Sequence, residues 1–320
     1  MFTFRRQQRV CRIGGVAVGG QPEENPPVLI GSMFHKGDRL LHSRLGKDFD
    51  RTGAGDLLKK QEELSQQMGL PAMVDLVGNT GDELKAYIDF VAGATSVPIC
   101  IDAWKLGPRL EAARYAAELG LLDRVLYNSV GPWSEDLERE VATLGEIGVK
   151  HVVLVAFDMD DQMPAGRMKC LARLLKALRG VPLESILVDT SVMNLPATAF
   201  CSLANYQVKK RHGLPVGSSP ANGTYMWKEA RLNWEEAGFA GVDAAVHALA
   251  SVLWHDFLFY GPLVAADRIF PAVAAATAFQ ATLVYGEGGG LPASPRHPLN
   301  QFFAGFAGQL SARAGAAPGG

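Results

Sequence analysis

Cysteine motifs and metal-ligand spacings are missing from this sequence. Its four cysteines, Cys11, Cys100, Cys170 and Cys201, form no CxxC pair, and its seven histidines show no HxH or HExxH spacing. The sequence therefore indicates neither a disulfide framework nor a metal site. Unpaired, reduced thiols are typical of cytoplasmic proteins, and we expect a cytoplasmic location.

Charge of one sign and long apolar runs are also missing. The chain has 31 Lys and Arg against 33 Asp and Glu, with a net charge of −2 and no block of like charges. This balance argues against nucleic-acid binding. No apolar core of a secretory signal follows the first arginines, and the most apolar stretch, 269–284, is short for a membrane span. We expect no membrane insertion; residues 269–284 should form a core or interface helix, and its apolar surface suggests a homodimer.

What the sequence does contain is a repeated alternation. Short runs rich in Val, Ile and Leu are typical of buried parallel strands, and each is followed by a longer stretch that is typical of a crossover helix. The predicted strands lie at 27–34, 72–78, 98–104, 124–131, 151–157, 185–192, 215–223 and 256–263. Eight such units predict a (β/α)8 TIM barrel, with an open doubly wound sheet as the alternative.

The domain organisation follows from the same pattern. We expect one barrel domain over 1–285, including an N-terminal β-hairpin at about 10–22 that could close the bottom of the barrel. Residues 225–254 hold more than one helix, so the connection between the last two strands is elaborated. A C-terminal extension, 286–320, is rich in Gly, Pro and Ala, and its last residues, SARAGAAPGG, are expected to be disordered and flexible.

Polar residues stand at the ends of the predicted strands, where barrel enzymes carry their active sites. In chain order these are Ser32, Asp75, Asp102, Asn128, Ser129, Asp158, Asp189, Ser218, Ser219, Asn222 and Tyr260. Carboxylates and amides that converge there would suit a ligand with several N–H donors, such as a pterin. A phosphate site fits less well because Pro220 removes a backbone donor, and Lys105 is the one lysine placed for Schiff-base chemistry.

Each candidate also has a structural interpretation. Asp75 could cap a helix or pair with an arginine, Asn128 could bind loop backbone, and Asn222 could be a turn residue. Asp102 and Asp189 lie within apolar runs, where a purely structural carboxylate is less usual, and this favours a functional role. Two tryptophans beyond strand ends, Trp104 and Trp133, could stack on a flat ring or pack under the loops.

Several segments together resemble one known family. The runs PPVLIGSMFHKGD, KKQEELSQQMGLP, VDLVG, YNSV and HGLPVGSSPANG are similar to the H subunit of tetrahydromethanopterin S-methyltransferase and its bacterial relatives, the methylcorrinoid:tetrahydrofolate methyltransferases. The likeness extends over about 19–263, and RHPLNQFF is similar to the C-terminal end of the family. The wider superfamily includes pterin-binding barrels such as dihydropteroate synthase.

The resemblance implies roles for the strand-end residues. Asp102, Asn128 and Asp189 would hold the pterin ring, and Asp75 and Ser129 would join them. Asn222 would reach N5 of the pterin, with Ser218 and Ser219 as alternatives. Catalysis would then rest on Asn222 and Asp189.

The resemblance also implies the reaction and its partners. A methyl group would move between methyl-Co(III) of a corrinoid protein and N5 of a reduced pterin, with tetrahydrofolate favoured over tetrahydromethanopterin. Asp38, His42 and Gly46 do not have the spacing of a DxHxxG corrinoid signature, so the cobalamin would be bound to a separate protein. The alternatives are a non-catalytic subunit that binds a corrinoid protein, and an enzyme of the dihydropteroate synthase type.

Overall fold

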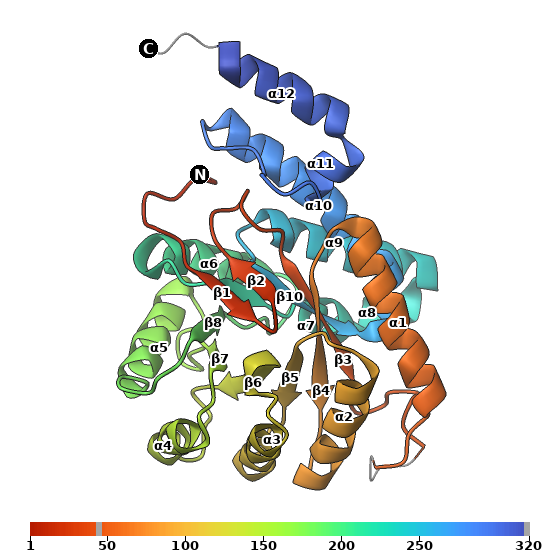
Figure 1. Cartoon of the computed structure of the whole chain (residues 1–320), viewed down its shortest axis with the longest axis vertical. Coiled ribbons are helices and arrows are strands. Elements are labelled where there is room, and N and C mark those ends of the chain that lie inside the picture. Colours follow the sequence, from red (N-terminus) through yellow and green to blue (C-terminus); the bar gives the residue numbers. More distant parts are fainter. Residues whose placement is uncertain (43–46, 317–320) are drawn as a thin grey trace.

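A closed barrel of eight parallel strands forms the centre of the computed structural model, which describes residues 1–42 and 47–316 (Figure 1). Its strands are β3 (Val28–Met33), β4 (Ala72–Val77), β5 (Ile99–Asp102), β6 (Val125–Val130), β7 (His151–Val155), β8 (Ser185–Asp189), β9 (Val216–Ser218) and β10 (Phe257–Pro262). Strand β10 pairs with β3 and closes the barrel. The predicted (β/α)8 barrel is therefore confirmed, and the open sheet is excluded.

Helices cover the outside of the barrel. After β3 to β8 and β10 come α1 (Arg51–Met68), α2 (Gly81–Ala94), α3 (Leu106–Glu118), α4 (Leu137–Ile147), α5 (Pro164–Ala177), α6 (Thr198–His212) and α10 (Ala266–Gly286). Local signals set the helix ends: Thr80 and Glu83 form a capping box at the start of α2, and Gly69 ends α1 with a φ of 67°. Such caps bond backbone groups that the helix itself leaves without partners.

The connection between β9 and β10 holds three helices, as the sequence predicts in outline. These are α7 (Pro220–Met226), α8 (Lys228–Asn233) and α9 (Glu236–Val252). Helix α9 packs along α10, and α7 packs against β10 at the mouth of the barrel. The excursion therefore brings helical residues to the end of the barrel where the strands terminate.

The N-terminal hairpin closes the opposite end of the barrel. Strands β1 (Val10–Ile13) and β2 (Val16–Gly19) place Cys11, Ile13 and Val18 against the apolar residues of the barrel interior. The backbone N–H of Gly14, at a φ of 51°, donates to the carbonyl of Asp123 at 2.8 Å, just before β6. The expected plug is confirmed, and the carboxyl end of the strands is left as the mouth.

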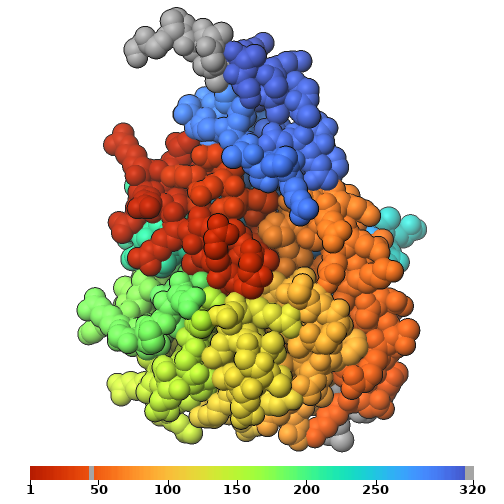
Figure 2. Space-filling view, viewed as in Figure 1, coloured from red at the N-terminus to blue at the C-terminus, as the bar shows by residue number. Residues whose placement is uncertain are grey.

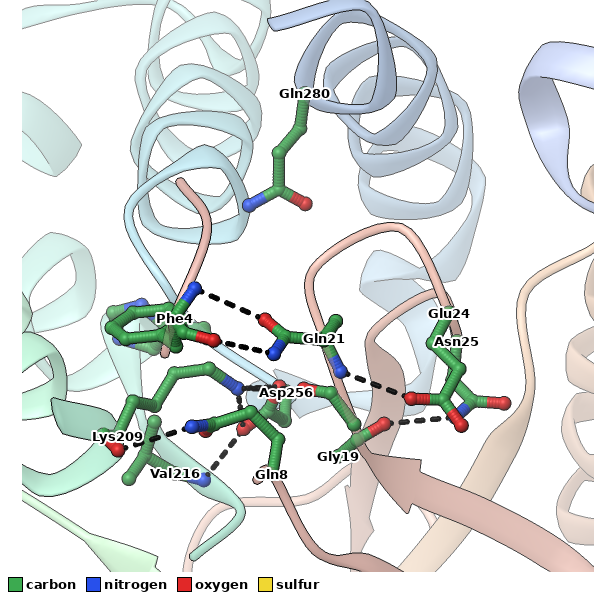
Figure 3. Close-up of polar contacts among 12 residues, drawn as sticks. Phe4, Gln8, Gly19, Gln21, Glu24, Asn25, Lys209, Val216, Asp256 and Gln280 are labelled. Carbon is green, nitrogen blue, oxygen red and sulfur yellow. Dashed lines mark hydrogen bonds and ion pairs between the residues drawn. The ribbon is translucent and has the colours of Figure 1, made fainter. Parts of the chain in front are cut away.

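A buried ion pair ties the segment around this hairpin to the barrel (Figure 3). Lys209 of α6 is 1% exposed, and its Nζ donates to Asp256 Oδ1 at 2.6 Å and to the carbonyl of Gly20 at 3.2 Å. Gln8 Nε2 donates to the carbonyl of Lys209 at 3.1 Å. A buried lysine is stable when it is paired and hydrogen-bonded in this way, so the network fixes the closed end.

The C-terminal extension has more regular structure than its composition suggests. It forms α11 (Pro298–Phe302) and α12 (Ala304–Ala316), beside the end of α10 (Figures 1 and 2). Helix α12 extends into the segment 311–320 as far as Ala316, and residues 317–320 lie outside the described part. In the described chain one helical segment, Leu263–Gly286, is long and apolar enough to cross a membrane by composition, but 56% of an apolar 18-residue stretch within it is buried, and α10 packs on α9.

Candidate active site

The alternation of side chains along each strand builds two layers inside the barrel. Side chains two residues apart on a strand share a face. The lower layer is apolar and buried against the hairpin, and includes Ile30, Met73, Cys100, Leu126 and Leu187. Two residues further along the same strands come Ser32, Asp75, Asp102, Asn128 and Asp189. The same strand geometry that fills the core therefore points five polar side chains into the mouth.

These side chains line one cavity of about 720 Å³. Of the residues that the sequence places at strand ends, those that line it are Ser32, Asp75, Asp102, Asn128, Ser129, Asp189, Ser219 and Asn222. Ser129 is next to the inward Asn128 and reaches the cavity because the register of β6 shifts between Asn128 and Val130. The strand ends and the first turn of α7 thus bring together residues that are up to 190 positions apart, from Ser32 to Asn222.

Ser218 is a correction to the sequence-based expectation. Its side chain is fully buried outside the cavity, with Oγ 2.8 Å from His255 Nε2. Gly217 of β9 and Ser219, directly after β9, face inward, so Ser218 between them faces the surrounding layer. Two other strand-end candidates, Tyr260 and Asp158, also lie away from the cavity. The hydroxyl of Tyr260 donates to Gln61 Oε1 at 2.5 Å.

Asp158 lies in the loop after β7. Its Oδ1 accepts from the backbone N–H of Asp160 at 3.0 Å and shapes the loop after β7. It does not line the mouth cavity. Asp158 therefore shapes the acidic loop that it forms with Asp160 and Asp161.

The three carboxylates of the cavity are poorly solvated. Burial raises the pKa of Asp102 and of Asp189 to about 6, and the positive charge of Arg109 opposes this rise at Asp102. Burial also raises the pKa of Asp75 well above its ordinary range, and the charge of Asp102 adds to the effect. Carboxylates in this state gain most from a ligand that donates N–H bonds to them.

Hydrogen bonds already orient two members of the site. Asp75 Oδ1 accepts from Asn128 Nδ2 at 3.2 Å, and Asp75 Oδ2 lies 3.3 Å from the hydroxyl of Ser32. Because Asn128 uses its nitrogen on Asp75, its oxygen is left as an acceptor for the cavity. Asp189 Oδ1 accepts from the backbone N–H of Ser191 at 2.6 Å, which fixes the carboxylate at the end of β8.

Arg109 is a cavity residue that the sequence does not reveal. It comes from the first turn of α3 and is 3% exposed. Its Nε donates to Tyr127 Oη at 2.9 Å and its Nη2 to Glu140 Oε1 at 2.8 Å. This buried cluster joins α3, β6 and α4 beneath the mouth. In the sequence the arginine resembles any solvated helix residue, and no pattern marks it.

One side of the cavity wall is apolar. Its members come from the ends of β5 to β8 and the loops that follow, and include Trp104, Trp133, Val155, Phe157, Met159 and Met193. Trp104 and Trp133 stack on each other, with ring centroids 5.7 Å apart and planes at 17°. Trp133 is half-buried whereas Trp104 is 76% exposed, so the pair forms a rim rather than part of the core.

Asn222 is held by a buried network behind α7. Thr224 Oγ1 donates to Asp243 Oδ1 of α9 at 2.6 Å, and Arg268 Nε of α10 donates to Asp243 Oδ2 at 2.8 Å. Arg268 Nη2 also donates to Tyr225 Oη at 2.8 Å. These bonds fix α7, and with it Asn222, at the mouth.

The arrangement suits a flat ligand with N–H donors. Carboxylates and one amide oxygen can accept hydrogen bonds from it, and apolar side chains of the same cavity can pack on its faces. In the described residues no group of three or more His, Cys, Asp or Glu is placed to hold a metal ion. The geometry therefore supports polar recognition of an organic ring.

Known proteins with similar sequences are components of methyltransferases. A sequence model of the tetrahydromethanopterin S-methyltransferase MtrH subunit matches residues 6–286. The H subunit of this enzyme from Methanopyrus kandleri is 31% identical over 296 residues, covering 86% of this chain and 91% of that protein. The protein from Methanocaldococcus jannaschii is 32% identical over 294 residues, covering 86% and 92%.

A further relative and two solved structures extend this picture. The H subunit of a putative methyltransferase mtx from Methanosarcina barkeri is 30% identical over 311 residues, covering 94% of this chain and 99% of that protein. Dihydropteroate synthase of Yersinia pestis, in a sulfonamide drug complex, superposes with a TM-score of 0.61 at 12% identity, covering 86% and 100%. The Xanthomonas albilineans enzyme gives 0.60 at 16%, covering 86% and 98%.

The structural likeness shows a shared barrel fold, whereas the sequence likeness covers most of the chain and of its relatives. The family expected from the quoted segments is thereby confirmed. The chain belongs to the MtrH subunit family of tetrahydromethanopterin S-methyltransferase, a family of methyltransferases.

Proposed function

We propose that this protein moves a methyl group between a corrinoid carried on a separate protein and N5 of a reduced pterin. Tetrahydrofolate is the favoured pterin and tetrahydromethanopterin the alternative. The observation that carries the proposal is the convergence of Asp75, Asp102, Asn128 and Asp189 in one cavity at the barrel mouth. Membership of a methyltransferase family supports the reaction type.

The hydrogen-bond acceptors of the cavity fit a pterin ring. The 2-amino group and N3–H of a pterin are adjacent donors, and a carboxylate accepts both in a paired fashion. Asp102 and Asp189 supply such carboxylates, and the oxygen of Asn128 supplies a further acceptor. The cavity volume of about 720 Å³ lies in the range of small-molecule sites.

The same wall disfavours a reaction of the dihydropteroate synthase type, which releases pyrophosphate. Among the described residues that line the cavity there is no lysine. The one arginine, Arg109, is bound to Glu140 and Tyr127. A polyanion would therefore find little compensating positive charge in the mouth.

The protein's contribution to the transfer is to bind and orient. When bound, the reduced pterin supplies N5 as the nucleophile that takes the methyl group, and in the reverse direction N5 must become more positive. Asp102 and Asp189 hold the ring by its N–H groups, which fixes the direction in which N5 faces. The Asn222 amide can hydrogen-bond to N5 and so hold that atom in line with the methyl group.

The rim offers a surface to the protein that carries the corrinoid. Trp104 is 76% exposed, Met159 70% and Met193 37%, and all three line the mouth cavity. Exposed apolar side chains gathered at one site are typical of interaction surfaces, and methionine adapts readily to a partner. Because the hairpin closes the other end of the barrel, a methyl donor bound to a protein must approach over this rim.

A homodimer is a separate part of the proposal. Phe279 of α10 is 61% exposed, and the neighbouring extension exposes Phe303 at 50% and Phe306 at 45%. These apolar side chains support self-association at the end of the molecule that carries α11 and α12. Sedimentation should give a dimer, and a monomer at micromolar concentration would reject this part.

Anaerobic calorimetry with tetrahydrofolate and with tetrahydromethanopterin tests the site, and spectroscopic demethylation of methylcobalamin tests the reaction. We expect binding of one pterin and pterin-dependent demethylation by the wild type, and neither by Asp189→Ala. Ser218→Ala is the matched control because its side chain lies outside the cavity. A chain that binds a corrinoid protein but no pterin would be a non-catalytic subunit instead.

A further inference from the structure

A second cavity adjoins the mouth cavity. Its volume is about 340 Å³, and it shares Ser32, His35, Tyr225 and Pro262 with the larger cavity. The shared residues lie at the ends of β3 and β10 and on α7. The two cavities are therefore adjacent, with these four residues at their common boundary.

Hydrogen-bond donors gather in this second cavity. Arg39, on the loop after β3, is exposed and makes no ion pair within the part of the chain that the structure describes. Tyr225 Oη accepts from Arg268 Nη2 at 2.8 Å, which leaves its own O–H to donate to a ligand. His35 Nδ1 is buried and has no hydrogen-bond partner, although Asp38 Oδ2 is 3.5 Å away.

The two acidic residues of the cavity, Asp38 and Glu236, do not occupy or neutralise these hydrogen-bond donors. Asp38 closes its own loop, because its Oδ2 accepts from the N–H of Phe34 at 2.7 Å and its Oδ1 from that of Leu40 at 3.1 Å. Glu236, in the first turn of α9, is exposed and so well screened by water. Arg39 and Tyr225 are thus the groups best placed to meet an anionic ligand.

The orientation of a pterin in the mouth would direct its side chain toward this cavity. In a reduced pterin the 2-amino group and N3 lie on one ring, whereas N5 and the substituted C6 are adjacent on the other. If Asp102 and Asp189 hold the first ring and Asn222 meets N5, the C6 substituent leaves next to Asn222. Tyr225 follows Asn222 by one helical turn and lines both cavities.

We propose that the second cavity binds the acidic tail of the pterin substrate, with Arg39 and Tyr225 contacting a tail carboxylate. This inference rests on the proposed function, because it takes the ring to lie in the mouth cavity. It assigns the substrate class as pterins that carry a negatively charged side chain. It also makes Arg39 a specificity-determining residue.

The experiment compares two ligands that share the ring. Anaerobic calorimetry measures the Kd of tetrahydrofolate, which has an acidic tail, and of 6-methyltetrahydropterin, which has none. For Arg39→Gln we expect tetrahydrofolate to bind about fivefold more weakly, the size of one partly exposed ion pair. Arg39→Glu should weaken it further, and neither variant should change the Kd of 6-methyltetrahydropterin.

The control is Lys36→Gln, which removes an exposed cation from the same loop but from neither cavity. Its two Kd values should equal those of the wild type, and added salt should reduce the advantage of tetrahydrofolate in the wild type more than in Arg39→Gln. Equal binding of tetrahydrofolate by wild type and Arg39→Glu would overturn the tail site alone. Failure of the wild type to bind either of these ligands or tetrahydromethanopterin would instead overturn the proposed function itself.

Discussion

Asp189→Asn should make the free protein more stable while it weakens pterin binding. Burial raises the pKa of Asp189 from 3.8 to about 6, so the folded chain disfavours the charge that it carries at neutral pH. Because a tenfold change in proton affinity corresponds to about 1.4 kcal/mol, this charge costs the folded state about 3 kcal/mol. Asparagine removes the charge and can keep the bond from the N–H of Ser191, now 2.6 Å long.

The expected gain at pH 7 is about 1 to 3 kcal/mol, since a buried amide still has some cost. The sign of its pH dependence follows from the raised pKa. The wild type gains stability as the pH falls from about 6 to about 4, because its folded state then binds the proton more tightly than its unfolded state. The variant has no titrating group at position 189, so its stability advantage over the wild type should vanish below about pH 4.

Binding should change in the opposite direction. Loss of a charged acceptor should weaken tetrahydrofolate binding about 10- to 100-fold. In the wild type, the affinity should fall as the pH drops through about 6, because protonation of Asp102 and Asp189 removes their charge and weakens their paired acceptance of N–H bonds. Denaturant unfolding at pH 7 and pH 4 and calorimetry over the same range provide the measurements. A variant that is destabilised at pH 7, or whose stability difference is the same at both pH values, would refute this reasoning.

Three further predictions concern the rest of the site. Asn222→Ala should lower the rate of methyl transfer about tenfold or more, whereas Ser218→Ala should leave it unchanged, as demethylation of methylcobalamin can show. Trp104→Ala should slow transfer from a corrinoid protein by raising KM but leave free methylcobalamin unaffected; equal loss with both donors would contradict a docking role. Glu140→Gln should destabilise the fold by about 3 kcal/mol in urea unfolding, because Arg109 loses its buried charge partner, and wild-type stability would refute that pairing.

Strand periodicity explains how much of the site could be read from the sequence. Asp102, Asn128 and Asp189 each follow an apolar inward residue by two positions, so the rule that places the core also places them. The closed barrel made their neighbourhood predictable as well, since carboxyl ends of parallel strands meet at one mouth. Correct strand boundaries were therefore enough to predict that these three side chains lie close together.

The site residues that the sequence misplaced or missed are those that strand periodicity does not determine. Strand β9 has three residues, too few to show which of Ser218 and Ser219 faces inward. Arg109 and Tyr225 come from helices whose rotation about their axes depends on tertiary packing. The second cavity arises between a loop, α9 and α10, and no local pattern marks such a junction. Sequence patterns thus placed most residues carried by strands, and Asn222 in the first turn of α7, but missed Arg109 of α3 and Tyr225 of α7.

The environments of the three carboxylates also divide their roles. The charge of Arg109 limits the rise of the pKa at Asp102, and the N–H of Ser191 and the charge of Arg167 limit it at Asp189, whereas burial and the negative charge of Asp102 raise the pKa of Asp75 well above its ordinary range. We therefore expect Asp102 and Asp189 to be the acceptors for ring N–H groups near neutral pH. Both oxygens of Asp75 already accept hydrogen bonds, from Ser32 and Asn128, so we expect Asp75 to act on a ligand through the orientation of the Asn128 amide rather than by direct contact.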